Sequence, residues 1–277
     1  MEINGVESYE HESPAAARRP ARRGAYLLPG VFTVANMLCG YYAILATFEA
    51  MLQGRSADMD YAARAIGLAI LFDALDGRIA RALGANSDFG REFDSLADVV
   101  SFGIAPAFLG YAWGVRNLPL SEAGQAVHIY QLGWLVGFIF VVACAWRLAR
   151  FNVNGMASSN SGFFVGMPAP AGAGIVAAVI HAVSTPIQNV GVSFLWLGLM
   201  VALALLMSST VRHYGFKNIR VDRKQSSRAF VVIALLVGSI VFYSQITLLL
   251  IASVYAVHGI VLELARLVRH RLASRPA

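Results

Sequence analysis

Charged residues are scarce in this chain of 277 residues: they make up 14% of it, whereas hydrophobic residues make up 57%. Soluble domains average about 25% charged and about 45–50% apolar residues, so this composition excludes an ordinary soluble protein. Cysteine is nearly absent, and we expect Cys39 and Cys144, which lie in apolar stretches, to pack rather than form a disulfide. The net charge of +6 is interpreted as a signal of membrane topology, not of nucleic-acid binding.

The first 25 residues also lack the apolar core and small-residue cleavage site of a secretory signal peptide. They are polar, and we expect a flexible cytoplasmic tail. Beyond them, apolar runs of about 20 residues predict an all-α, polytopic transmembrane helical bundle. The eight predicted spans are residues 26–52, 60–83, 92–115, 127–149, 167–187, 192–211, 228–245 and 247–267. The division between the last two is the weakest, which leaves seven spans as the alternative.

This pattern divides the chain into the tail (1–25), a six-helix core (26–211), a basic cytoplasmic loop (212–227) and two extra helices with a basic tail (228–277). Of the 22 Lys and Arg residues, only Arg55, Arg64 and Arg116 fall on one side of the predicted bundle. All the others fall on the side that holds both termini. Because positive charge accumulates on the cytoplasmic side of membrane proteins, the sequence predicts cytoplasmic termini.

Four aspartates interrupt the apolar sequence. Asp73 and Asp76 are three residues apart, and Asp94 and Asp98 are four apart, so on helices each pair lies on one face. An ionised Asp at the centre of a bilayer costs about 2.5–3.5 kcal/mol on insertion scales, so four of them need compensation. Divalent cations could provide it, because carboxylates are the hard oxygen ligands that Mg²⁺ and Mn²⁺ prefer. The alternative is a set of interfacial acids that nearby arginines neutralise.

The arrangement of these residues is Asp73-x2-Asp76-Gly77-x2-Ala80-Arg81-x8-Gly90-x3-Asp94-x3-Asp98. It resembles, at all eight fixed positions, the motif of the CDP-alcohol phosphotransferase family. The resemblance implies an integral-membrane enzyme that transfers a phosphatidyl-type group from a CDP-linked donor to an alcohol and releases CMP. It implies two divalent cations, Mg²⁺ or Mn²⁺, at a site formed by all four aspartates, with Asp98 also the catalytic base. It further implies a CDP site lined by Thr33, Asn36, Asp76, Gly77, Arg81 and Gly90.

Two pairs of polar residues allow more than one interpretation from the sequence alone. Thr33 and Asn36 could face the cleft, or they could make the ordinary hydrogen bonds of polar residues between membrane helices. Arg147 and Arg150 could bind an anion through their guanidinium groups, or they could extend to the membrane interface at a helix C-terminus. Two Gly-x3-Gly pairs, Gly110–Gly114 and Gly133–Gly137, predict close helix packing within a bundle or a dimer.

Three strings, residues 95–107, 147–152 and 164–172, are similar to the membrane-embedded bacterial phosphatidylserine synthases. This resemblance implies that CDP-diacylglycerol and L-serine are the substrates. It also implies a homodimer among the lipids of the bacterial inner membrane, with the active site on the cytoplasmic side and no nucleic-acid partner. The residues expected to bind serine are Arg147, Arg150, Asn152, Gly166 and Pro168.

The same residues are also compatible with other functions. The aspartate motif concerns the donor, so the acceptor could instead be glycerol phosphate, inositol phosphate or choline. A divalent-cation transporter would explain the acids but not the spacing of the glycines and Arg81, and an inactive relative would be a third possibility. None of the six histidines begins a His-x-Lys motif, so the sequence gives no support for a covalent histidine intermediate.

Overall fold

The computed structural model describes residues 27–84, 87–119, 123–154, 163–209, 212–214, 245–247, 250 and 254. The predicted N-terminal tail, most of the basic loop and most of the two predicted C-terminal helices lie outside these residues. The predicted count of eight spans is therefore not confirmed.

Within the described residues the chain is almost entirely helical, as predicted. The elements are α1 (Leu27–Gln53), α2 (Ser56–Leu83), α3 (Asp88–Asp98), η2 (Val99–Ile104), α4 (Ala105–Tyr111), η3 (Ala112–Arg116), α5 (Ala123–Asn154), β1 (Phe163–Val165), α6 (Ala169–Val183), α7 (Val190–Ser208) and β2 (Arg212–Tyr214). They include a helix for each of the six spans predicted between residues 26 and 211. The antiparallel pair of short strands, β1 and β2, was not predicted.

In the part of the chain that the structure describes, four helical stretches are long and apolar enough to cross a membrane: Gly30–Gln53, Asp88–Arg116, His128–Val153 and Val190–Ser208. Helix α6 is apolar but shorter. Large apolar side chains point outward from these helices; Leu38 is 63% exposed, Trp134 66% and Leu195 76%. Soluble proteins rarely expose so much apolar surface, whereas in a bilayer these side chains face lipid. The fold is that of an integral membrane protein.

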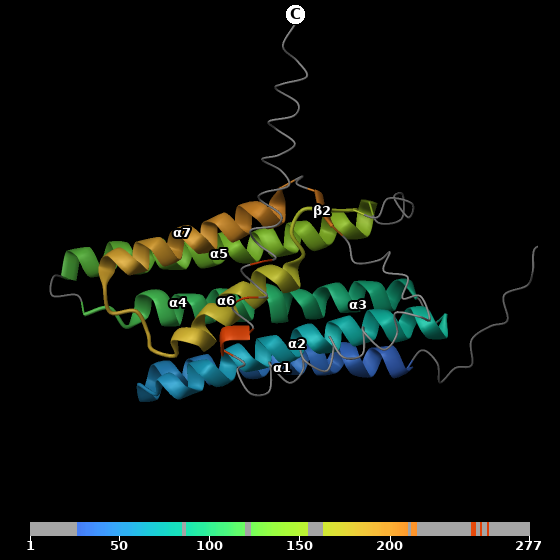
Figure 1. The fold of residues 1–277 in the computed structure, drawn as a ribbon, viewed down its shortest axis with the longest axis horizontal. Helices are drawn as coiled ribbons and strands as arrows, with labels where there is room; N and C mark the ends of the chain where they lie inside the picture. Colours follow the sequence, from blue (N-terminus) through green and yellow to red (C-terminus); the bar gives the residue numbers. More distant parts are fainter. Residues whose placement is uncertain are drawn as a thin grey trace, which may run out of the picture.

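The helices are arranged in layers (Figure 1). Helices α1 and α2 pack against each other on one side, and α5 and α7 pack against each other on the other side. Between them lie α3, α4 and α6, and the segment η2 contacts both α1 and α5. The middle of the bundle is therefore formed by the part of the chain that carries Asp94 and Asp98.

The third predicted span is one helical rod with two π-helical segments, η2 and η3. The segment η2 begins at Val99, directly after Asp98. A π-helical turn changes the angular position of the side chains that follow it, and such turns often occur at functional sites. The regular 3.6-residue period read from the sequence therefore does not hold beyond Asp98.

Both Gly-x3-Gly pairs pack helices within the chain. A Cβ at Gly114 would lie 2.1 Å from Cδ1 of Trp196 on α7, and one at Gly110 would lie 2.8 Å from the sulfur of Met200. Gly133 faces the side chain of Val115, at 2.9 Å by the same measure. These glycines let large side chains of neighbouring helices approach the backbone. Of the two possibilities left open by the sequence, the structure shows a bundle contact.

Candidate active site

The two helices that carry the aspartates follow each other in the sequence. Helix α2 ends at Gly84, whose φ of 61° lies in the left-handed region that favours glycine. Helix α3 then begins with Ser87 as its N-cap, whose hydroxyl oxygen accepts a hydrogen bond of 3.0 Å from the backbone N–H of Gly90. Four residues, 84–87, therefore separate α2 from α3 in the sequence.

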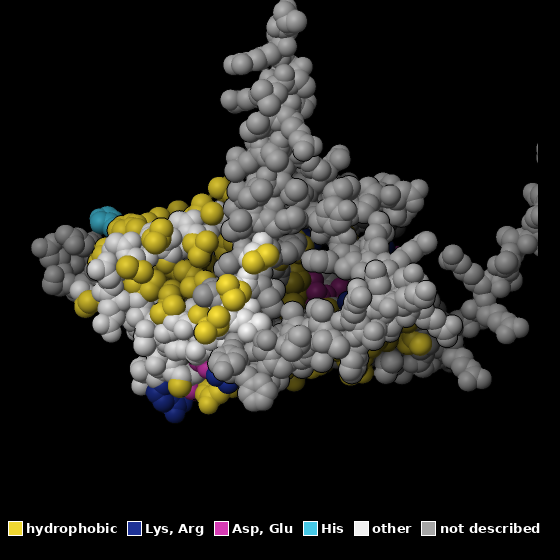
Figure 2. All heavy atoms as spheres, viewed as in Figure 1, with side chains coloured by type: hydrophobic (Ala, Val, Ile, Leu, Met, Phe, Trp, Pro, Cys, Tyr) yellow, Lys and Arg dark blue, Asp and Glu magenta, His cyan; other side chains and the backbone are white. Residues whose placement is uncertain are grey.

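Three of the four aspartates meet. Carboxylate oxygens of Asp73, Asp94 and Asp98 all lie within 4.8 Å of one another. Asp98 is buried, and the side chains of Asp73 and Asp94 are half-buried. Figure 2 shows acidic side chains recessed near the middle of the molecule. The predicted convergence of the acids of two helices is confirmed for these three residues.

The three carboxylates fit a divalent cation. The Oδ1 atom of Asp94 is buried and has no hydrogen-bond partner among the described residues. A buried carboxylate oxygen is costly when it lacks a partner, and convergent carboxylates repel each other. A hard cation such as Mg²⁺ or Mn²⁺ would satisfy both conditions, because it takes several oxygen ligands. The group could therefore hold a metal ion.

Asp76 does not belong to this group of three. Its Oδ2 atom accepts a hydrogen bond from the hydroxyl of Thr33 on α1. Residues three apart on a helix are offset by about 60° around its axis, so Asp76 can contact Thr33 on α1 while Asp73 lies in the group of three. The sequence placed both on one face, and this offset separates them.

Helix α1 contacts a second aspartate through Asn36. The Nδ2 atom of Asn36 donates a hydrogen bond of 2.9 Å to Oδ1 of Asp98. Thr33 and Asn36 are both buried. The side chains predicted to line the CDP site are thus hydrogen-bonded to two of the aspartates.

Arg147 on α5 is one of the two arginines predicted to bind serine. It is buried, and its charge interacts with those of Asp73 and Asp98. Its guanidinium carbon also lies 5.9 Å from the centre of the Phe151 ring. A buried guanidinium beside the carboxylates can bind an anionic substrate group there.

Arg150, one turn later, makes a different set of contacts. Its guanidinium donates hydrogen bonds to the carbonyl oxygens of Met207, Ser208 and Ser209, at 3.4, 3.0 and 2.9 Å. These are carbonyl groups at the end of α7, which lack partners within the helix. A Cβ at Gly166, where φ is 83°, would lie 2.5 Å from Nη2 of Arg150. Arg150 and Gly166 therefore form a junction between α5, α7 and the start of α6.

The other predicted acceptor residues lie at the same junction or near α3. Pro168 is the N-cap of α6, and its carbonyl oxygen accepts hydrogen bonds from the N–H groups of Ala171 and Gly172. Asn152 donates to Oγ of Ser95 at 3.0 Å and to Oε2 of Glu92 at 3.3 Å. Asn152 thus connects the end of α5 to the helix that carries Asp94.

The remaining predicted CDP residues lie along α2 and α3. A Cβ at Gly77 would meet only the side chain of Arg81, whose Nη1 would be 3.5 Å away. A Cβ at Gly90 would lie 2.9 Å from Oγ of Ser87, so a side chain there would require the capping hydroxyl to shift. Packing within the described residues does not restrict Gly77 in this way.

Acidic residues at the other end of α2 have different surroundings. Asp60, about 20 Å along the axis from Asp73, bonds to Nδ1 of the buried His181 and to Arg64 at 2.7 Å. Asp58 pairs with Arg55 at 2.9 Å. Cationic or histidine partners thus satisfy these two acids, whereas Asp94 retains an oxygen without a hydrogen bond.

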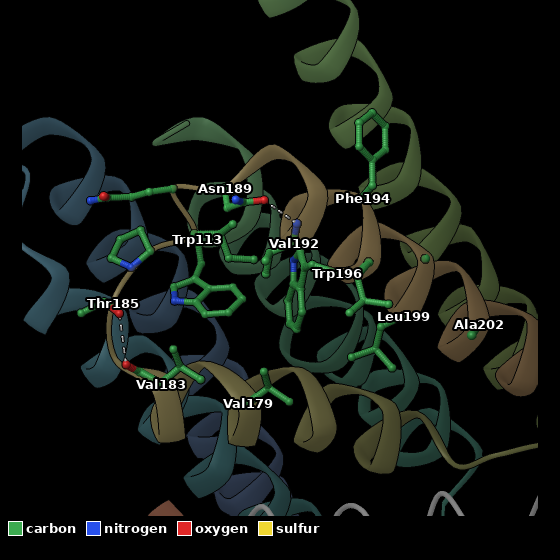
Figure 3. Close-up of a pocket in the computed structure, with 15 residues that line it drawn as sticks. Trp113, Val179, Val183, Thr185, Asn189, Val192, Phe194, Trp196, Leu199 and Ala202 are labelled. Carbon is green, nitrogen blue, oxygen red and sulfur yellow. Dashed lines mark hydrogen bonds between the residues drawn. The ribbon is translucent and has the colours of Figure 1, made fainter. Parts of the chain in front are cut away.

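The close-up in Figure 3 shows a cavity of ≈ 820 Å³ between α6, α7 and the loop that joins them. Its lining is mainly apolar and includes Trp113, Val179, Val192 and Leu199. None of the four aspartates lines it. This groove is therefore separate from the polar centre.

Comparisons with known proteins agree with the motif. The family model for CDP-alcohol phosphatidyltransferases matches residues 26–209. The CDP-diacylglycerol–serine O-phosphatidyltransferase of Helicobacter pylori (strain J99) is 30% identical over 243 residues, which cover 85% of this chain and 90% of that protein. The enzyme of the same name from Bacillus subtilis (strain 168) is 30% identical over 201 residues, 73% of this chain and 97% of its own. That of Mycobacterium leprae is 38% identical over 162 residues, 56% of this chain and 48% of its own. The chain belongs to the CDP-alcohol phosphatidyltransferase family.

Proposed function

We propose that this protein transfers the phosphatidyl group of CDP-diacylglycerol to L-serine and releases CMP. The observation that carries the proposal is the convergence of Asp73, Asp94 and Asp98, with one carboxylate oxygen of Asp94 left without a hydrogen bond. The serine acceptor is supported by the names of the relatives and by the three similar strings. An integral protein of the bacterial inner membrane, with a cytoplasmic active site and a homodimeric assembly, completes the proposal.

In the proposed reaction, the serine hydroxyl oxygen attacks the phosphorus atom that bears the diacylglycerol. The bond from this phosphorus to the bridging oxygen of the diphosphate breaks, and CMP leaves with that oxygen. Asp98 accepts the proton of the serine hydroxyl. Arg147 is proposed to bind the serine carboxylate, because it is a buried cation close to Asp98. The contacts of Arg150 and Gly166 support a role in holding the acceptor side of the site together.

Asp73, Asp94 and Asp98 would hold Mg²⁺ or Mn²⁺, and the proposal extends to Asp76 and to a second ion by resemblance to the family. When bound, such ions neutralise the charge of the diphosphate and of the leaving group. Gly77, Arg81 and Gly90 are proposed to line the CDP site on α2 and α3. The phosphates would approach the α2 backbone at Gly77, next to the guanidinium of Arg81.

An acceptor screen tests the proposed function. The purified full-length protein in detergent is given CDP-diacylglycerol and Mn²⁺ or Mg²⁺, with serine, glycerol phosphate, inositol phosphate or choline in separate reactions. We expect CMP and phosphatidylserine in equal amounts with serine. CMP release with another alcohol but not with serine would contradict the assigned acceptor. Metal flux into proteoliposomes without any CMP release would indicate a transporter.

A substitution at Gly77 tests the CDP site. In Gly77→Ala the new methyl group would make only ordinary van der Waals contact with Arg81, and alanine is the better helix former. We therefore expect an unchanged or higher thermal midpoint in detergent. The same methyl group would displace the donor, and kcat/KM for CDP-diacylglycerol should fall by about 10- to 100-fold.

The matched control is Gly67→Ala on the same helix, where a Cβ would meet nothing within 4 Å. It should likewise leave the thermal midpoint unchanged or raise it, and it should leave kcat/KM unchanged. Equal kinetics in the two variants would show that the donor does not approach α2 at Gly77.

A further inference from the structure

The side chain of Asn36 is hydrogen-bonded to Asp98. It is fully buried, and its Nδ2 atom donates to Oδ1 of Asp98 at 2.9 Å. Its own Oδ1 has no hydrogen-bond partner among the described residues. A buried amide oxygen without a partner is unfavourable, so the favourable contribution of this amide comes from its Nδ2 group. This Nδ2 group contacts Asp98, one of the three convergent aspartates.

The backbone of Asn36 is fixed against the same segment. The hydroxyl of Ser101, in η2, donates a hydrogen bond of 2.9 Å to the carbonyl oxygen of Asn36. One turn further along α1, a Cβ at Gly40 would lie 2.5 Å from Oγ and 2.7 Å from Cα of Ser101. The two helices come this close only because Gly40 has no side chain. Helix α1 is therefore held in position directly beside Asp98.

Asp98 lies at the end of the regular helix α3, where the π-helical segment η2 follows. At this transition the regular ladder of backbone hydrogen bonds changes, and with it the direction of the neighbouring side chains. The hydrogen bond from Asn36 gives the carboxylate of Asp98 a partner on another helix, α1.

We propose that Asn36 is a positioning residue that holds the carboxylate of Asp98 in the orientation in which it joins Asp73 and Asp94 to bind a divalent cation. This inference rests on the proposed function, and it replaces a direct contact between Asn36 and CDP. Hydrogen-bond partners of metal-binding carboxylates orient them, and their loss typically costs about 10- to 100-fold in metal affinity. Ser101 and Gly40 act through Asn36 by fixing the position of α1.

The test is the affinity of the full-length protein for Mn²⁺, measured in detergent from the electron paramagnetic resonance signal of free Mn²⁺. We expect Asn36→Ala to bind Mn²⁺ about 10- to 100-fold more weakly than the wild type. Thr47→Val is the matched control, because Thr47 is also buried on α1 but its hydroxyl donates only within the helix, to the carbonyl of Ala43. It should bind Mn²⁺ with the affinity of the wild type.

A milder variant keeps the test decisive if Asn36→Ala does not fold. Ser101→Ala removes only the hydrogen bond to the carbonyl of Asn36. We expect this variant also to bind Mn²⁺ more weakly than the wild type, but by only about threefold to tenfold, a smaller loss than in Asn36→Ala. Wild-type affinity in both Asn36→Ala and Ser101→Ala, or in Ser101→Ala alone where the other does not fold, would overturn the inference.

CDP binding without divalent cations separates the two roles of Asn36. A positioning residue should leave the affinity for CDP in the presence of a chelator unchanged. Weaker CDP binding together with wild-type Mn²⁺ affinity would show a direct contact with the donor and overturn the inference. If the wild type itself binds no Mn²⁺, the metal centre of the proposed function fails, and this inference falls with it.

Discussion

Replacement of Asp98 by asparagine is expected to lower kcat by about 10²- to 10⁴-fold, the usual contribution of a positioned general base. Asparagine has nearly the same shape as aspartate, but its amide does not accept the proton of the serine hydroxyl. Its Oδ1 can still accept the hydrogen bond that Asn36 donates to Asp98 in the structure. The thermal midpoint should therefore stay close to that of the wild type. The affinity for Mn²⁺ should fall, because Asp98 is one of the three proposed metal ligands, so kcat is compared at saturating Mn²⁺.

The control for this substitution is Asp58→Asn. Asp58 lies in the first turn of α2 and pairs with Arg55 on the surface, far from the aspartate group. Asp58 is half-buried and Arg55 is exposed, so the loss of this pair should cost little stability and should leave kcat unchanged. If Asp98→Asn retains more than about a tenth of the wild-type kcat, Asp98 is not the general base.

Asp94→Asn is expected to have the second large effect. The Oδ1 atom of Asp94 is buried and lacks a hydrogen bond, so a bound cation is the partner that best explains it. We expect the Mn²⁺ concentration for half-maximal activity to rise by about 100-fold or more. This exceeds the usual effect of losing a hydrogen-bond partner of a metal ligand, because here the ligand itself is changed. A chelator should abolish turnover of the wild type, and added Mn²⁺ should restore it.

Asp76→Asn is the informative comparison. Asp76 lies outside the group of three and is hydrogen-bonded to Thr33, so its effect on the Mn²⁺ requirement should be the smaller one. A larger effect at Asp76 than at Asp94 would mean that Asp73, Asp94 and Asp98 are not the principal metal ligands.

The spacing of the aspartates predicted much of the candidate site. The i, i+4 spacing of Asp94 and Asp98 puts both on one face of α3, and their carboxylate oxygens lie within 4.8 Å of one another and of that of Asp73 on α2. The spacing alone did not predict that Asp76 is hydrogen-bonded to Thr33, because a spacing of three residues leaves a rotation of about 60° between the two side chains. Helical periodicity alone does not indicate which neighbour a side chain meets.

The contacts that the sequence did not predict are tertiary. Arg150 was expected to bind the substrate, but its guanidinium lies on carbonyl groups at the end of α7, 57 to 59 residues away. Every helix leaves such carbonyls without partners, yet the sequence does not indicate which arginine reaches them. The π-helical turn after Asp98 and the Gly40–Ser101 approach also depend on packing between helices.

The most direct test of the account is the position of a bound metal ion. Crystals of the full-length protein grown with Mn²⁺ should give an anomalous difference peak between the carboxylates of Asp73, Asp94 and Asp98. Peaks confined to other parts of the protein, with these three carboxylates free of metal at saturating Mn²⁺, would contradict it.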